Sequence, residues 1–220
     1  MDTPIKVSYQ FTDNAYIASQ WLEDLPDLFA ADFEVASKFS AKTKEHMKVR
    51  LDVVPNLSFE EKRVLKQKIA SDGLSHPSMT VVTHLSIAWS DRDSIVIVCS
   101  NNKIRDMVYD FLINTDKTQI WHNATFDFKH IYYRTGYIPK NYIDTMLLAK
   151  CILNDANSFK DNVNLKALMA YAYGDWAISK DNFTLEEMWD ENMIKYAATD
   201  SPATYKLYHD ILEDQNKWKI

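Results

Sequence analysis

Glycine is scarce in this chain, with three residues among 220. The P-loop pattern G-x-x-x-x-G-K and the dinucleotide-binding pattern G-x-G-x-x-G both need glycines that let the backbone approach a phosphate. Neither pattern occurs in the sequence. The sequence therefore argues against nucleotide binding through either kind of loop.

Cysteine is equally rare, and apolar runs of membrane-spanning length are missing. Cys99 and Cys151 lie far apart in apolar segments, without the spacing of a zinc site. We expect both to be buried thiols of a reducing compartment. The chain begins without a secretory signal. These features predict a soluble protein without membrane contact, cytoplasmic in a bacterium or in the host cell of a virus.

An excess of positive charge is absent as well, because the formal net charge is −6. Such a balance disfavours a protein that simply coats nucleic acid phosphates. The charge is unevenly distributed: residues 38–68 contain nine Lys and Arg against four acids, so this segment carries +5 and the remainder −11. We expect the basic segment either to contact a nucleic acid strand or another partner, or to be a solvated face.

Apolar residues make up 46% of the chain and aromatic residues 13%, which is typical of a folded globular domain with an ample core. Hydrophobic periodicity predicts strands over residues 5–11, 28–36, 80–90, 94–100 and 118–122. It predicts helices over residues 14–25, 58–71, 103–113, 126–134, 145–153, 165–173, 184–199 and 202–215. Residues 37–55 are polar and basic without clear periodicity, and we expect them to be irregular.

Helix-capping signals support several of these boundaries. The expected N-terminal caps are Ser58 with Glu61, Thr184 with Glu187, Asp144 and Asn164. The order of the elements predicts one α/β domain over residues 1–220, with a mixed sheet flanked by helices and a basic helical insertion at about 38–76. Residues 80–90 and 94–100 should form an antiparallel hairpin within that sheet.

The strand predicted over residues 28–36 contains two carboxylates, Asp32 and Glu34. Residues two apart in a strand point to the same face, so both carboxylates converge on one spot. Like charges that close repel each other, and burial increases the cost of ionising them. The pair is therefore either solvated at a strand end or compensated by a divalent cation.

Three further polar residues lie near the ends of predicted elements. Asp127 follows the strand 118–122 at a strand-to-helix junction, near the sheet edge where α/β proteins form their sites. Tyr196 and Asp200 are four residues apart and share one face of the helix 184–199. Taken alone, Asp127 fits an acid that complements a helix dipole, and the second pair fits a partly buried tyrosine beside a solvated acid.

Together the four acids, Asp32, Glu34, Asp127 and Asp200, could supply the hard oxygen ligands that Mg²⁺ or Mn²⁺ prefers. Tyr196 could orient a water beside them. These are the parts of two-metal phosphodiester hydrolysis, in which one ion generates hydroxide and the other steadies the leaving oxygen. The residues alone predict a metal-dependent hydrolase.

The sequence resembles the DEDD superfamily of 3′–5′ exonucleases in its tyrosine form (DEDDy), and in particular the proofreading domains of family A DNA polymerases. The resemblance covers about residues 5–212. Three motifs match in order: Asp32-Phe-Glu34, Asn123-Ala-Thr-Phe-Asp127 and Tyr196-Ala-Ala-Thr-Asp200. Two supporting stretches also match: Asp144-Thr-Met-Leu147, and Asn164-Leu-Lys-Ala-Leu168 before Tyr173-Gly174.

The resemblance implies an RNase H-like fold with a five-stranded mixed sheet and a site for two divalent cations, Mg²⁺ or Mn²⁺. Asp32, Glu34 and Asp200 would hold the first ion, Asp32 would be shared with the second, and Asp127 would hold the second largely through water. Tyr196, helped by Glu34, would position the attacking water.

The resemblance also implies residues that contact the substrate. Asn123 and Phe126 would lie along the terminal nucleotides, with Phe33 beside them. The apolar wedge that the family places after Asp-x-Glu falls here at Lys38, so we expect Lys38 to contact the substrate and Phe39, beside it, to stack on a base. The excursion after the first motif is also longer than usual. Pro202 follows Asp200 closely and is expected to bend or restart the helix there.

The resemblance favours hydrolysis at the 3′ end of single-stranded or frayed DNA, releasing 5′-mononucleotides, with a possible proofreading role beside a DNA polymerase during DNA replication. Two alternatives remain open: an RNase D-like exoribonuclease, and an inactive nucleic-acid-binding or polymerase-docking module. The sequence ends about twenty residues after the third motif. It is therefore either a stand-alone enzyme or a fragment of a longer polymerase.

Overall fold

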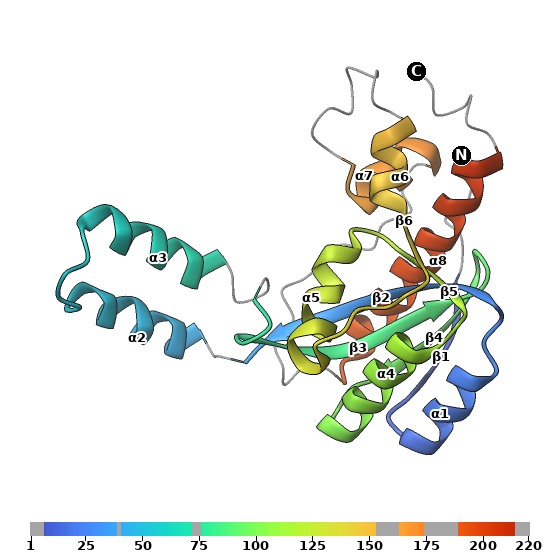
Figure 1. Cartoon of the computed structure of the whole chain (residues 1–220), viewed down its shortest axis with the longest axis horizontal. Helices are drawn as coiled ribbons and strands as arrows, with labels where there is room; N and C mark the ends of the chain where they lie inside the picture. Colours follow the sequence, from blue (N-terminus) through green and yellow to red (C-terminus); the bar gives the residue numbers. More distant parts are fainter. Residues whose placement is uncertain (1–6, 39–40, 72–75, 153–162, 174–188, 214–220) are drawn as a thin grey trace.

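The computed structural model describes residues 7–38, 41–71, 76–152, 163–173 and 189–213 (Figure 1). The strands are β1 Ser8–Thr12, β2 Leu28–Ser37, β3 Thr80–Ala88, β4 Asp93–Val98, β5 Thr118–Trp121 and β6 Tyr142–Asp144. The helices are α1 Ala15–Glu23, α2 Ala41–Asp52, α3 Phe59–Ser71, α4 Asn102–Asn114, α5 Ala124–Thr135, α6 Thr145–Ile152, α7 Leu165–Tyr173 and α8 Glu191–Glu213.

The strands form one mixed sheet in the order β1-β4-β3-β2-β5-β6. The predicted hairpin is confirmed, since β3 and β4 pair antiparallel, and β2 is antiparallel to β3 on the other side. The pairs β1–β4, β2–β5 and β5–β6 are parallel. The sequence predicts five strands, whereas the described sheet has six. The additional strand, β6, has three residues, which is too short for a visible alternation.

Helices cover both faces of the sheet (Figure 1). The main core lies between the sheet and the helices α1, α4 and α5, which contribute Leu22, Ile104 and Ile131 among other residues. The helix α8 packs on the opposite face, where the small side chains of Ala197 and Ala198 let it approach β4 closely. A second, smaller core joins α6 and α7 to the C-terminal half of α8. The central strands are thus covered on both faces.

The helix α8 runs unbroken through Pro202, although the sequence predicts a bend or a restart at that residue. Proline has no N–H, so it leaves the carbonyl four residues earlier, that of Ala198, without its usual helical partner. The Ser94 hydroxyl on β4 donates a hydrogen bond of 2.9 Å to this carbonyl. The proline therefore marks a point where the helix is hydrogen-bonded to the sheet. The prediction of two separate helices here is wrong.

The beginning of α8 also differs from the prediction. Trp189 and Asp190 are not helical, and α8 begins at Glu191 rather than in the region of Thr184. The Asp190 carboxylate accepts a hydrogen bond of 2.8 Å from the backbone N–H of Asn192, as a cap does. The capping box predicted at Thr184 and Glu187 lies outside the described residues.

The helices α2 and α3 form an arm that projects from the body of the protein (Figure 1). The capping box that opens α3 is confirmed: Ser58 and Glu61 exchange backbone-to-side-chain hydrogen bonds of 2.7 and 3.2 Å. The prediction that residues 37–55 are irregular is wrong, because α2 occupies most of them. This helix packs on α3 rather than on the main core, so it has no apolar stripe that could reveal it.

One carboxylate caps two helices at once. Asp144 ends β6 and accepts hydrogen bonds of 3.0 and 2.9 Å from the backbone N–H groups of Asn123 and Ala124, where α5 begins. It also accepts bonds of 2.9 and 3.4 Å from Met146 and Leu147 in the first turn of α6. The predicted cap of α6 is confirmed. Its second role fixes the start of α5.

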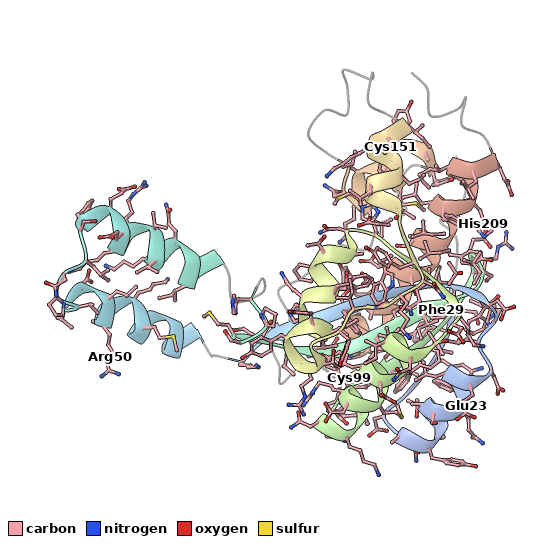
Figure 2. The ribbon with its side chains drawn as sticks, viewed as in Figure 1. Glu23, Phe29, Arg50, Cys99, Cys151 and His209 are labelled. Atoms are coloured by element: carbon pink, nitrogen blue, oxygen red, sulfur yellow. The ribbon has the colours of Figure 1, made fainter. Side chains whose placement is uncertain are left out.

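The two cysteines differ in exposure. Cys99 is buried, and this burial raises the pKa of its thiol to about 12. Cys151 lies on α6 and is exposed, so the prediction that it is buried is wrong (Figure 2). Its apolar neighbours in sequence pack inward, while Cys151 occupies the opposite side of the last helical turn. In the described part of the chain, no helix has the length and apolar character needed to cross a bilayer.

The double cap gives a first prediction. We expect Asp144→Ala to lower the free energy of unfolding by about 2–4 kcal/mol, because two helix starts lose charge-assisted hydrogen bonds together. Urea denaturation measures this value. Asp116→Ala, at an exposed loop position, is the matched control and should change stability by less than about 0.5 kcal/mol. Equal losses in the two variants would contradict the capping role.

Candidate active site

Three carboxylates from distant parts of the sequence converge beside the centre of the sheet. Asp32 and Glu34 come from β2 and Asp200 from α8, and one oxygen of each lies within 4.8 Å of the others. Glu34 is only 4% exposed, whereas Asp32 and Asp200 are partly exposed. The face shared by the two β2 carboxylates therefore points at the helix α8, as their spacing of two residues predicts.

A pair of serines fixes α8 at this place. Ser86 on β3 is the register partner of Asp32 on β2. The Ser86 hydroxyl and that of Ser201, the residue after Asp200, lie 2.5 Å apart, and both serines are buried. This hydrogen bond holds the Asp200 backbone beside the Asp32 strand. Neither serine stands in a motif that would reveal this role from the sequence.

A β-bulge lies directly beside Glu34. The register of β2 and β3 shifts between Glu34 and Val35: Glu34 faces His84, but Val35 faces Val82, so Thr83 is the extra residue. The Thr83 hydroxyl donates a hydrogen bond of 3.1 Å to the Glu34 carbonyl. Bulges often re-aim side chains next to sites. This one lets β3 keep apolar side chains toward the main core on both sides of the shift.

Asp127 joins the site from the first turn of α5. It is 2% exposed, and its carboxylate accepts a hydrogen bond of 3.2 Å from the backbone N–H of Phe33, the residue between Asp32 and Glu34. Burial raises the pKa of Asp127 well above its usual range, and the nearby charge of Glu34 raises it further. The site thus combines buried acids that repel one another, which is the environment a multivalent cation would relieve.

Tyr196 lies one helical turn before Asp200 and is 3% exposed. Burial raises the pKa of its hydroxyl, and so do the charges of Asp200, Glu34 and Asp32 together with a hydrogen bond to Asp200. Tyr196 therefore keeps its proton throughout the physiological pH range. It can donate a hydrogen bond to Asp200 and can accept one at its oxygen, but it cannot serve as a base.

The residues expected to contact substrate lie in different surroundings from one another. The Phe33 side chain is 3% exposed and packs edge-on against Tyr109 and Trp121 in the main core. It points away from the site because it alternates with Asp32 and Glu34 along β2. Phe39 lies outside the described residues.

Two other members of that set lie at the start of α5. Asn123 adopts a left-handed backbone conformation with φ of 63°, and its side chain makes no capping hydrogen bond because Asp144 caps the helix instead. A non-glycine residue in this conformation is uncommon and is found often at sites. Phe126 is partly exposed, and the Lys129 ammonium lies 4.1 Å from the centre of its ring.

The site includes residues that the sequence analysis missed. His84 is fully buried and faces Glu34 across β2 and β3. Lys166 on α7 places its ammonium 4.6 Å from the centre of the Tyr196 ring. The match at Asn164-Leu-Lys-Ala-Leu168 contains Lys166 and could have suggested it. Nothing in the sequence distinguishes His84 from any other histidine in a buried strand.

Three basic side chains of the arm have their partners within the arm. Arg63 contacts Glu60 at 2.5 Å and Lys66 contacts Asp52 at 2.6 Å. Lys62 donates a hydrogen bond of 2.9 Å to the Asp52 carbonyl. Of the two interpretations of the basic segment, this pairing favours the solvated face over a dedicated strand contact for these residues.

The sequence matches one known family. A profile of the 3′–5′ exonuclease family matches residues 74–215, more than half of the chain. The matched stretch contains Asp127, Tyr196 and Asp200 but begins after β2, so Asp32 and Glu34 enter the site from outside it. No curated protein matches the chain in sequence.

Solved structures share the fold at low sequence identity. NrnC of Brucella melitensis with bound Mg²⁺ is 17% identical, with a TM-score of 0.57 over 98% of this chain and 83% of that chain. NrnC bound to pGG is 18% identical, with a TM-score of 0.57 over 99% and 87% of the two chains. RNase D of Trypanosoma brucei in complex with RNA U12 is 13% identical, with a TM-score of 0.58 over 93% and 62%.

The strand order, the convergent acids and the family match agree with one another. The six-stranded mixed sheet carries helices on both faces and shares its fold with RNase H-like exonucleases. With a profile match over more than half of its length, the chain belongs to the 3′–5′ exonuclease family.

Proposed function

We propose that the chain removes 5′-mononucleotides from the 3′ end of a nucleic acid strand by metal-dependent hydrolysis. The observation that carries this proposal is the convergence of Asp32, Glu34 and Asp200 within 4.8 Å, beside the buried Asp127. The same convergence supports catalysis over an inactive binding or docking module. A module that only binds would have no need to bring buried like charges together.

The donor set fits two divalent cations. Asp32, Glu34 and Asp200 offer clustered carboxylate oxygens, which suit Mg²⁺ or Mn²⁺. They would hold one cation, while Asp32 and Asp127 would hold the other. When bound, such cations supply an acidified attacking water and neutralise charge on the leaving oxygen.

The protein's own groups would orient the reactants. Tyr196 keeps its proton, so its oxygen can accept a hydrogen bond from the attacking water while its O–H is held by Asp200. Glu34 is buried on the same side and can hold the second hydrogen of that water. Lys166, beside the Tyr196 ring, adds a positive charge where a phosphate would lie. Asn123 and Phe126 are proposed to contact the terminal nucleotides.

Two kinds of substrate are candidates, DNA with deoxyribose and RNA with ribose. The polymerase-type motifs favour DNA, which would allow a proofreading role beside a DNA polymerase. The similar solved structures favour RNA or short oligonucleotides, because RNase D was solved with RNA U12 and NrnC with pGG. The distinguishing measurement is the release of mononucleotides from matched DNA, mismatched DNA and RNA of equal sequence.

The first test of the function is an end-labelled assay. We expect mononucleotide release from the 3′ end with Mg²⁺ or Mn²⁺ and none after chelation. Asp32→Ala should lower kcat at least about 10³-fold, because it removes a ligand shared by both cations. Asp91→Ala, at a partly exposed acid in the turn between β3 and β4, should retain full activity. Undiminished cleavage by Asp32→Ala would refute the proposed mechanism.

The second test measures cation binding without turnover. Mn²⁺ should raise the melting temperature of the wild-type protein, because it binds the folded state and relieves the repulsion among the buried acids. Asp200→Asn should abolish most of this increase, whereas Asp91→Asn should keep it. Calorimetric titration with Mn²⁺ gives the stoichiometry. Equal shifts in all three proteins would place the cation elsewhere.

The third test separates positioning from binding. Tyr196→Phe keeps the buried ring but removes the hydroxyl, and we expect kcat to fall about ten- to hundredfold with little change in KM. Tyr132→Phe, at an exposed position on α5, should have no effect. A large rise in KM with an unchanged kcat would show that the hydroxyl binds substrate rather than orienting water.

A further inference from the structure

A hollow of about 130 Å³ lies at the root of the arm, outside the carboxylate site. It is bordered by the end of β2, the start of β3, and the helices α4 and α5. The residues that line it include Lys38, Thr80, Arg105, Asp106, His130 and Arg134. Three of these side chains carry a positive charge in a chain whose net charge is −6.

Of the three cations in the hollow, Arg134 is the one that forms an ion pair with a carboxylate of the described chain. Arg134 donates two parallel hydrogen bonds of 2.8 and 2.9 Å to the carboxylate of Asp106. Arg105 donates instead to the Cys99 carbonyl and to the side-chain oxygen of Asn102. Among the described residues, no carboxylate lies within ion-pair distance of Arg105, although its charge helps to lower the pKa of Asp106 in the same hollow.

Within the part of the chain that the structure describes, Lys38 likewise has no carboxylate at ion-pair distance and is held by backbone carbonyls. Its ammonium donates hydrogen bonds of 3.0 and 3.2 Å to the carbonyls of Pro77 and Ser78. Burial lowers the pKa of Lys38, and the charge of Arg105 lowers it further. Two cations are thus fixed near each other by backbone carbonyls and an amide, although their repulsion is unfavourable. A bound anion would remove this cost.

The remaining wall of the hollow is neutral. The two ring nitrogens of His130 lie 3.1 Å from the Phe126 carbonyl and 2.9 Å from the Thr80 hydroxyl. Burial lowers the pKa of His130 to about 4, so it is uncharged at neutral pH. The positive charge available to a ligand therefore comes from Lys38 and Arg105, with Asp106 engaged mainly by Arg134. The fixed guanidinium of Arg105 suits the oxygens of a phosphate.

Two chain segments, one from β2 and one in α5, lead from the active site to the hollow. Lys38 lies four residues beyond Glu34 on the same chain segment, about 13 Å away at ~3.3 Å per residue. This distance is too great for one phosphate to touch both the carboxylate site and Lys38. On the side of α5, His130 lies one helical turn beyond Asp127. A strand whose 3′ end reaches the acids could therefore pass this hollow.

We propose that Lys38 and Arg105 bind one phosphate of the substrate strand, on the 5′ side of the phosphate that is cleaved. This inference rests on the proposed exonuclease function and adds to it a contact that only substrates longer than a minimal one can make. It gives Lys38 a role in holding the sugar-phosphate backbone of the substrate rather than in separating its bases.

The experiment compares substrate lengths. We measure KM for a dinucleotide and for a pentanucleotide with the wild-type protein, Lys38→Gln and Arg105→Gln, and with Lys103→Gln as a matched control on the exposed side of α4. We expect the ratio of the pentanucleotide KM to the dinucleotide KM to rise about tenfold in the first two variants. The slope of log KM against log salt should fall by about 0.7 for each lost contact.

Replacing one phosphate of the substrate at a time by a neutral linkage identifies the phosphate that Lys38 and Arg105 bind. A methylphosphonate placed at one linkage at a time should weaken binding to the wild type at one linkage on the 5′ side of the cleaved one, and this effect should be smaller in Arg105→Gln, where only Lys38 remains to contact that phosphate. Because Arg105→Gln also loses the bond to the Cys99 carbonyl, Arg105→Lys is included and should restore part of the affinity. A KM ratio and a salt slope that match those of Lys103→Gln would overturn the proposal.

Two further measurements separate this proposal from binding of free phosphate and from failure of the proposed function. If inorganic phosphate raises the melting temperature of the wild type but not of Arg105→Gln, while the KM ratio is unchanged, the hollow takes free phosphate and the proposal is wrong. If the protein shows no nuclease activity at all, the proposed function fails instead. In that case, metal-free binding of a labelled pentanucleotide to Asp32→Asn, with and without Lys38→Gln, still tests the hollow by fluorescence anisotropy.

Discussion

The repulsion among the buried carboxylates is the constraint on which the structure depends. Glu34 and Asp127 are almost fully buried, and the first of them adds to the cost of ionising the second. Such an arrangement lowers the stability of the protein unless a cation is bound or the acids hold protons. The surrounding hydrogen bonds must therefore supply the stabilising free energy that repulsion in the site removes. Residues outside the carboxylate cluster, such as Asp144 and Ser86, belong to this support.

Three elements hold the carboxylates in place, and each is itself positioned by a different kind of contact. The strand β2 places two acids by simple alternation. The helix α5 begins under the control of Asp144, so that its first turn offers Asp127 to the backbone of β2. The helix α8 is held by serine hydroxyls, one of which replaces the hydrogen bond that Pro202 cannot make. Loss of any of these would move one carboxylate relative to the others.

Much of this arrangement could be predicted from the sequence, because it follows local rules. The alternation in β2, the caps at Ser58 and Asn164, and the β3–β4 hairpin are each determined by neighbouring residues. The structure has the caps and the hairpin as expected. The convergence of Asp32 and Asp200 was also predictable, but only by combining short motifs that are weak when taken alone.

The remaining features depend on contacts between distant segments. The arm helix α2 has no apolar face toward the main core, so its sequence lacks the periodicity that identifies a helix. The continuity of α8 depends on Ser94, more than one hundred residues before Pro202, and no local rule links the two. The burial of Phe33 follows from alternation. The motif predicts a contact of Phe33 with substrate, whereas alternation along β2 places its ring in the main core.

The long helix α8 has a consequence for how the protein unfolds. Its first half carries Tyr196 and Asp200 against the sheet, and its second half supplies Leu207 and Ile211 to the small core with α6 and α7. One continuous helix therefore belongs to two packing units, and neither can open without disturbing the other. Local fluctuations in the α6–α7 region and the integrity of the carboxylate cluster should form a single cooperative unit in hydrogen exchange.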